Sequence, residues 1–276
     1  MSKNEQEIKN PASAVKPLGP PKSAVREYFE SFVVTLIMAI FGMTFILQAV
    51  TVPTGSMQNT ILIGDYLLVN KFIFAPGGKP VPLLPQREIE RGDVIVFKYP
   101  GNKVDPREDI ELGVKAYREN YVKRVIGLPG ETIEFRNNQI FINGEFLPEH
   151  RNITLDERTL SEMPLKDSEQ RLPGENYDVY YSERSMEAVE RKQNLTRGFN
   201  FGVAGKPMKI PDHMYFAMGD NRDNSGDSRV WGFVHRDLII GRAMFVYWSC
   251  DRAASGGSMF GCITNPRLDR IGKMIK

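Results

Sequence analysis

Cysteine and histidine are both scarce in this chain of 276 residues, which contains two cysteines and three histidines. Cys250 and Cys262 lie twelve positions apart, with no CxxC pair and no cluster of histidines beside them. A zinc site is therefore not expected, and the two thiols either form one disulfide or remain buried and free. Export of the domain from the cytoplasm would favour the disulfide.

An excess of charge of one sign is also missing, because 36 basic residues accompany 34 acidic ones and leave a formal net charge of +2. This balance gives no indication of a nucleic-acid partner. The hydrophobic share of 41% and the charged share of 25% are typical of a globular chain and exclude a largely disordered one.

Charged residues are absent from positions 31–64, and residues 32–52 are predominantly apolar. This length matches the roughly 20 residues that a helix needs to cross a bilayer. A cleaved signal peptide has a shorter apolar core, about 7–15 residues, close to the N-terminus, whereas some thirty residues precede this one. The sequence therefore predicts an uncleaved transmembrane anchor over residues 31–52.

Basic residues flank this segment unequally, which predicts its orientation. Five bases precede it, whereas the first base after it is Lys71. By the positive-inside rule, the proline-containing tail of residues 1–30 lies in the cytoplasm and residues 53–276 lie outside.

The exported part shows short apolar and β-branched runs separated by turn residues, at positions 66–72, 93–99, 121–126, 132–135, 140–142, 214–218 and 238–247. This pattern predicts an all-β domain. Asn143-Gly144 and the stretch Arg136-Asn137-Asn138 are typical of tight hairpin turns. Residues 148–210 are polar and weakly patterned apart from one strand candidate at 177–181, so we expect an inserted subdomain there.

Two short elements contain residues suited to nucleophilic catalysis. Ser56 lies in the sequence PTGSM just after the apolar segment, which by itself is typical of a Gly/Ser turn. Lys123 interrupts an apolar strand, where alternation places it on the same face as Tyr121 and Val125. An edge strand or a lysine stem that reaches solvent would also explain this position.

A third element, residues 219–234, is rich in Asp, Asn and Ser. An EF-hand calcium loop is excluded, because the position of its closing glutamate falls on Gly232. Asp227 and Arg229 are spaced to pair with each other, and Ser225 is available to orient a neighbouring side chain.

Together with residues 91–100 (RGDVIVFKYP), these elements resemble the bacterial type I signal peptidase family, in the family's order and after a membrane anchor. The resemblance covers residues 50–71, 91–99, 121–131 and 219–234. It implies that Ser56 is the nucleophile and that Lys123 is the general base. Thr54, where the family more often has serine, matches the hydroxyl of the oxyanion hole, which pairs with the backbone N–H of Ser56.

The resemblance also implies that Ser225 orients the lysine and that Asp227 and Arg229 form a structural ion pair. The residues that would line shallow pockets for small substrate side chains are Val50, Val52, Met57, Ile61 and Val122. The implied fold is a signal-peptidase-like antiparallel β domain with an N-terminal transmembrane helix and an inserted subdomain.

The implied activity is that of a serine endopeptidase in the bacterial cytoplasmic membrane, with one membrane pass and the catalytic domain outside. Its partners would be preproteins with Ala-x-Ala-like cleavage sites and the lipid bilayer. No metal or organic cofactor is expected. A peptidase dedicated to one substrate, and an inactive module that binds exported chains, are the alternatives.

Elementary chemistry agrees with these roles, because only a neutral lysine can take the proton of a serine hydroxyl. Its usual pKa, about 10.4, must therefore be lowered by burial. A histidine base is the rival, and of His150, His213 and His235 only the last lies near a motif.

At the C-terminus, Leu268, Ile271 and Ile275 have helical spacing and would suit a membrane surface, but so short a segment is more typical of a frayed end.

Overall fold

The computed structural model describes residues 23–75, 83, 85–155, 162–166, 170–191, 193, 198–252, 254–256 and 258–276. The chain divides into two compact units, Met1–Gly42 and Met43–Lys276. Of the predicted cytoplasmic tail, residues 1–30, the first 22 lie outside the described residues, and residues 24–30 form the start of a helix.

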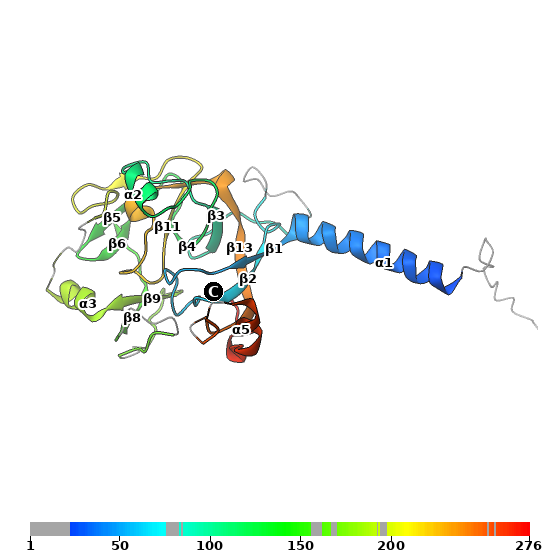
Figure 1. Ribbon diagram of the computed structural model, residues 1–276. Coiled ribbons are helices and arrows are strands. Elements are labelled where there is room, and N and C mark those ends of the chain that lie inside the picture. The colour runs from blue at the N-terminus through cyan, green and yellow to red at the C-terminus, as the bar shows by residue number, and fades with distance from the viewer. Residues whose placement is uncertain are drawn as a thin grey trace, which may run out of the picture. The chain divides into compact units, whose positions relative to one another are not determined.

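Helix α1, Ala24–Phe41, is the described part of the first unit (Figure 1). Ser23 caps it by accepting a hydrogen bond from the backbone N–H of Arg26. A π-helical turn, Gly42–Ile46, prolongs it, and the combined segment Ala24–Ile46 is long and apolar enough to cross a membrane.

The helix is shifted toward the N-terminus relative to the predicted span of residues 31–52. It includes charged residues, among them Arg26 and Glu30, which form an ion pair of 2.8 Å one turn apart. At the other end, Leu47–Thr51 is strand β1. The apolar residues Val50 and Val52 are buried in the core of the second unit, so hydropathy alone did not separate them from the helix.

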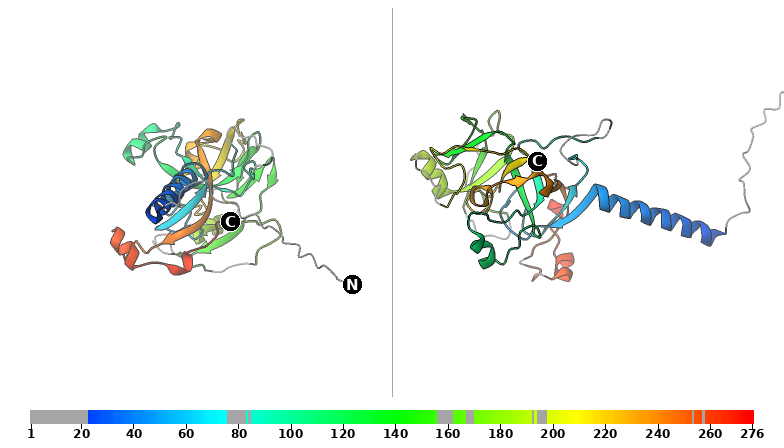
Figure 2. Two further views of the ribbon diagram at one scale, coloured as in Figure 1. Left: turned by 90° about the vertical axis from the view of Figure 1, so that its right-hand side faces the viewer. Right: turned by 90° about the horizontal axis from the view of Figure 1, so that it is seen from above.

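The main sheet of the second unit contains seven strands in the order β1-β2-β13-β3-β4-β11-β12, with antiparallel pairing throughout (Figure 1). Its strands after β1 are β2 Asp65–Asn70, β3 Val94–Lys98, β4 Asn120–Gly127, β11 Met214–Met218, β12 Val234–His235 and β13 Ile239–Ser249. The prediction of an antiparallel all-β domain is confirmed. The pairing register of β13 shifts along both β2 and β3, and Figure 2 shows this long strand curving past its neighbours.

The second sheet has the order β10-β5-β6-β7. Its strands are β5 Thr132–Arg136, β6 Gln139–Ile142, β7 Glu145–Phe146 and β10 Met208–Lys209. Asn137, Asn138 and Asn143 have φ values of 49°, 57° and 53°, and Gly144 follows at 86°. These left-handed conformations are those of two-residue hairpin turns, as predicted.

The described part of residues 148–210 contains β8 His150–Thr154, which runs parallel to β9 Asp178–Ser182, and then helix α3 Glu183–Glu190. Val179 and Tyr181 of β9 are buried in one hydrophobic cluster with Ile126 and Phe216 of the main sheet. The segment therefore packs on the same core and belongs to the same compact unit.

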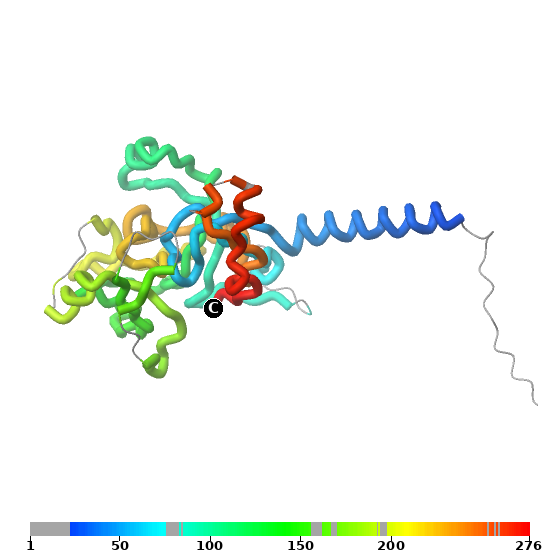
Figure 3. The backbone as a smooth tube through the Cα atoms, turned by 60° about the horizontal axis from the view of Figure 1, so that its bottom comes forward, coloured from blue at the N-terminus to red at the C-terminus, as the bar shows by residue number. Residues whose placement is uncertain are grey.

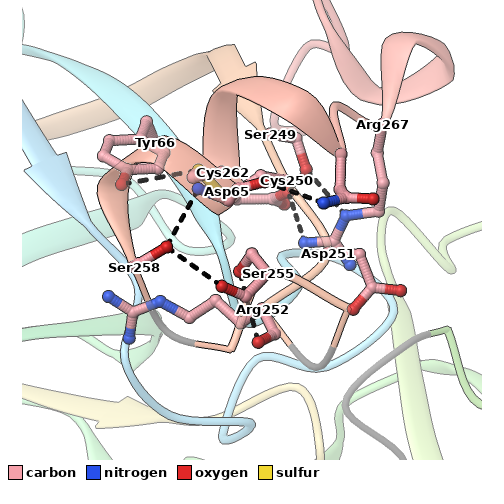
Figure 4. Close-up of a disulfide and its surroundings, with 12 residues drawn as sticks. Asp65, Tyr66, Ser249, Cys250, Asp251, Arg252, Ser255, Ser258, Cys262 and Arg267 are labelled. Carbon is pink, nitrogen blue, oxygen red and sulfur yellow. Dashed lines mark hydrogen bonds and ion pairs between the residues drawn. A yellow bond between two sulfur atoms is a disulfide. The ribbon is translucent and has the colours of Figure 1, made fainter.

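The C-terminal segment is closed by a disulfide between Cys250 and Cys262, which answers the question left open by the sequence (Figure 4). Helix α5, Met259–Thr264, begins inside this loop, contains Cys262 and ends two residues beyond it. A frayed end was the wrong expectation for the tail, because Ile275 is 3% exposed and its N–H donates to the carbonyl of Met244. Figure 3 shows the end of the chain folded back on the second unit.

Candidate active site

Ser56 lies in the loop that joins β1 to β2, and this loop is closed by its own backbone. The N–H of Val52 donates to the carbonyl of Asp65, and the N–H of Gly64 donates to Val52. Met57 and Ile61 are 1% and 0% exposed, so their side chains anchor the loop in the core.

Residues 219–229 support this loop from the other side. The backbone N–H of Asn221 donates to the carbonyl of Ser56 at 3.1 Å, and its side-chain Nδ2 donates to the carbonyl of Gly55 at 3.1 Å. The carbonyl groups on either side of the Ser56 N–H are thereby fixed.

Lys123 lies in β4, and its Nζ is 2.5 Å from Ser56 Oγ. The residue is only 3% exposed and pairs across the sheet with Ile95 of β3. The alternation of β4 thus directs the lysine into the protein toward the serine rather than toward solvent, which excludes the alternative of a lysine stem reaching water.

Burial is the main reason why the pKa of Lys123 is lowered from 10.5 to about 8. Asp227 opposes this shift, Arg229 adds to it and Asp220 opposes it. At pH 7 about a tenth of the lysine is then neutral, compared with less than one part in a thousand at its usual pKa.

Gly219 marks a close approach between the two halves of the site. A Cβ on this residue would lie 2.3 Å from the carbonyl oxygen of Ser56 and 2.3 Å from Ser225 Oγ, so only glycine fits. Ser225 Oγ is buried and has no hydrogen-bond partner among the described residues. The hydroxyl is therefore near the Ser56 loop, but it does not bond to Lys123 in this structure.

Asp227 and Arg229 form a buried ion pair with an N–O distance of 2.8 Å. Burial acts against the charge of Asp227, but Arg229 and the N–H of Gly219 outweigh it and lower the pKa of this carboxyl. Arg229 also donates to the carbonyl of Arg222 at 2.7 Å. The pair thus fixes both ends of the 219–229 loop.

A cavity of about 560 Å³ opens beside Ser56 and Lys123. It is lined by residues 52–57, 112–114 and 119–123 together with Asn224 and Gly226. Thr54 is exposed in it. The five residues expected to form substrate pockets all belong to one hydrophobic cluster or pack against it. Val52, Met57 and Val122 also line this cavity, whereas Val50 and Ile61 do not.

One wall of the cavity was not foreseen from the sequence. It consists of Leu112, Gly113 and Val114, which follow the short helix α2, Pro106–Glu111. Tyr121 also lines the cavity and stacks on Tyr99 with ring centroids 4.5 Å apart. The alternation that places Tyr121 on the face of Lys123 was a usable signal for the tyrosine, whereas the segment around Leu112 has no pattern in the sequence.

The histidines occupy other places in the described part of the chain. His150 pairs with Asp178 at 2.5 Å between β8 and β9, and His235 caps a short 3₁₀ helix by accepting from the N–H of Asp237. None of His150, His213 and His235 lines the cavity that contains Ser56, so the geometry favours lysine over histidine as the neighbouring base.

Comparison with known proteins places these features in a family context. The family model described as signal peptidase, peptidase S26, matches residues 25–248. A signal peptidase I from Pseudomonas fluorescens is 33% identical over 81% of this chain and 72% of its own length. One from Aquifex aeolicus is 30% identical over 90% of this chain and 97% of its own. A crystal structure of a signal peptidase I from Enterococcus faecalis, 25% identical, covers 56% of this chain and 97% of that chain with a TM-score of 0.29.

Proposed function

The chain belongs to the signal peptidase family, peptidase S26, and is a serine endopeptidase of the signal peptidase I type; we propose that it cleaves signal peptides with Ser56 as nucleophile and Lys123 as general base. The observation that carries this proposal is the 2.5 Å contact between Ser56 Oγ and a buried lysine whose pKa is lowered to about 8.

In the first chemical step, neutral Lys123 accepts the proton of the Ser56 hydroxyl while Oγ attacks the carbonyl carbon of the scissile peptide bond. The lysine, now charged, gives the proton to the leaving amine, and an acyl ester of Ser56 remains. A water molecule, deprotonated by the same lysine, then releases the new C-terminus and restores the serine.

The negative oxygen of the tetrahedral intermediate needs donors, and we assign the Thr54 hydroxyl and the Ser56 backbone N–H to this role. Thr54 stands two residues before the nucleophile and is exposed in the cavity. For Ser225 we propose that its hydroxyl orients the amine of Lys123, since its Oγ is buried, finds no hydrogen-bond partner in the part of the chain that the structure describes, and lies beside the close contact of Gly219 with the Ser56 carbonyl.

The substrate is expected to bind as an extended strand beside β4. Among the described strands, β11 is the neighbour of β4 on this side, and their pairing begins at Arg124, which pairs with Met218. Residues 120–123 of β4 therefore have no strand partner on this side in the described structure. Residues 120–123 pair with β3 on one side and border the cavity with the other. A free strand edge supplies main-chain hydrogen bonds for a peptide, and Val52, Met57 and Val122 supply apolar contacts for small side chains.

Cleavage of a precursor by the detergent-solubilised protein is the direct test of the proposed function. A signal-bearing precursor and its mature form are separated, and the new N-terminus is identified by sequencing. Cleavage after a small residue at the end of the signal peptide supports the proposal. An intact precursor, or cleavage at scattered sites, contradicts it.

We propose that helix Ala24–Ile46 anchors the protein in the cytoplasmic membrane with its N-terminus inside. Protease added to intact spheroplasts should then digest the second unit and spare an N-terminal fragment that contains the helix. An immunoblot against a tag at each end reads this out, with lysed spheroplasts as the control. Protection of the second unit would overturn the orientation.

The pH dependence of cleavage should report the pKa of Lys123. Because the neutral amine is the base, the rate rises with pH and levels off above a midpoint of about 8, rather than near 10.5. The measurement is kcat/KM for a short signal-peptide substrate between pH 6 and 10, with circular dichroism at each pH to show that the fold persists. A midpoint near 6.5 would indicate a histidine base instead.

A further inference from the structure

Asn59, three residues after Ser56, has an unusual backbone. Its φ is 71°, in the left-handed region, and the residue is only 4% exposed. Asparagine tolerates this conformation better than most residues, because its short polar side chain can bond locally. In this protein the Asn59 side chain does not bond locally but reaches Met163.

The amide of Asn59 pairs with both backbone polar groups of Met163. Its Nδ2 donates to the carbonyl of Met163 at 3.0 Å, and its Oδ1 accepts from the N–H of Met163 at 2.7 Å. Met163 lies 104 residues further along the chain and is 1% exposed. Two buried hydrogen bonds thus join the nucleophile loop to the segment of residues 148–210, whose purpose the sequence did not indicate.

A second set of bonds fixes the same stretch of the loop from another direction. The hydroxyl of Thr60 donates to Asp220 Oδ2 at 2.7 Å, and Asp220 forms a buried ion pair with Arg124, the neighbour of Lys123. The N–H of Tyr180 in β9 donates to the carbonyl of Asp220. The inserted segment therefore contacts the loop directly through Met163 and indirectly through Asp220.

We infer that Asn59 is a positioning residue, and that its pairing with Met163 makes the inserted segment part of the catalytic machinery by holding the Ser56 loop at bonding distance from Lys123. This inference rests on the proposed roles of Ser56 and Lys123. The loop between Ser56 and Asn59 is short, so a shift of the Asn59 backbone displaces the serine. Misplacement of a reacting group by about 1 Å costs up to about a hundredfold in rate.

Two variants separate positioning from mere stabilisation. Asn59→Gly keeps the left-handed backbone accessible but removes both bonds to Met163. Asn59→Asp keeps the shape and the acceptor, but replaces the Nδ2 donor with an oxygen that faces the Met163 carbonyl. We expect kcat to fall about 10–100-fold in both variants while KM changes less than about threefold. Hydrogen exchange of the amides at 57–61 should become faster.

Asn143→Gly is the matched control, because Asn143 also has a positive φ of 53° and its side chain also accepts a backbone N–H, that of Thr132, in a hairpin of the second sheet. Its kcat should stay at the wild-type value.

The inference is overturned if both folded Asn59 variants keep the wild-type kcat and only their melting temperature falls, since the pairing then stabilises without positioning. If one variant does not fold, the other decides. If neither folds, Asn59 serves the fold as a whole and the positioning role is withdrawn. Ser56→Ala, assayed in parallel, tests the dyad separately. Cleavage by that variant would refute the proposed mechanism, whereas the exchange rates at 57–61 would still report whether Asn59 holds the loop.

Discussion

Ser56→Ala and Lys123→Met should each lower kcat/KM for precursor cleavage by more than about 10⁴-fold, and the double variant should be no slower than either single one. Groups that act as one catalytic unit are strongly non-additive, because loss of either leaves the other without a task. The 2.5 Å contact between Ser56 Oγ and Lys123 Nζ is the physical basis for treating them as one unit. The measurement is the rate of precursor conversion for the four proteins under one condition.

The stability of the Lys123→Met variant is the control for this experiment, because it shows whether lost activity comes from lost folding. Folding lowers the pKa of Lys123, so below about pH 8 the amine is charged in both the folded and the unfolded state and its burial costs free energy. Above about 10.5 it is neutral in both states, and the cost is absent. Between these limits the unfolded state binds more protons, so stability rises with pH.

Methionine has a similar volume and no charge. The free energy of unfolding of Lys123→Met should therefore exceed that of the wild type at pH 7 by on the order of 3 kcal/mol. This difference should vanish at high pH, where the lysine is neutral in both states. Urea unfolding at pH 7 and pH 10 tests this. A folded Lys123→Met protein that cleaves at nearly the wild-type rate would falsify the dyad, and a second base would have to be sought among the groups lining the cavity.

The sequence indicated the strands reliably where β-branched residues alternate, as in 121–126, and where aromatic and other apolar residues cluster, as in 214–218. It also indicated the hairpin turns, because asparagine and glycine have a specific physical advantage at positive φ. Lys123 was recognisable because a buried cation inside an apolar strand is costly and therefore seldom there without a purpose.

Other features could not be predicted, for identifiable reasons. Hydropathy does not distinguish a lipid-facing helix from a core-facing strand, so the boundary at Leu47 was missed. The tail was expected to fray because local propensity is weak there, but Arg270 forms an ion pair of 2.6 Å with Asp65, which is 0% exposed, and this contact spans 205 positions. Long-range contacts of this kind leave no local pattern.

The contact between Asn59 and Met163 belongs to the same class. In the sequence, Asn59 is one polar residue in a Gly- and Thr-containing turn, and Met163 lies in a stretch without periodicity. Asn59 bonds to the backbone N–H and carbonyl of Met163, and every residue type except proline has these two groups. The identity of residue 163 therefore gives no sign of the contact. The residues that hold a catalytic loop in place are thus less visible in a sequence than the residues that react.

Thr54→Val should lower kcat by about 10²–10³-fold and leave KM nearly unchanged. Valine keeps the branched shape of threonine but cannot donate a hydrogen bond, and loss of one oxyanion donor typically costs about 2.7–4 kcal/mol in the transition state. Thr54 is exposed in the cavity, so its replacement by valine should not disturb the core. Steady-state kinetics with a signal-peptide substrate separate kcat from KM.

Thr54→Ser is the matched control, since it keeps the hydroxyl and removes only a methyl group. It should retain most of the wild-type kcat. Because Thr54 precedes Ser56 by two residues, a change of loop conformation would affect both variants alike, whereas loss of the donor affects only valine. Equal losses in the two variants would mean that the methyl group positions the loop, and the oxyanion role of Thr54 would then have to be abandoned in favour of the backbone N–H of Ser56 alone.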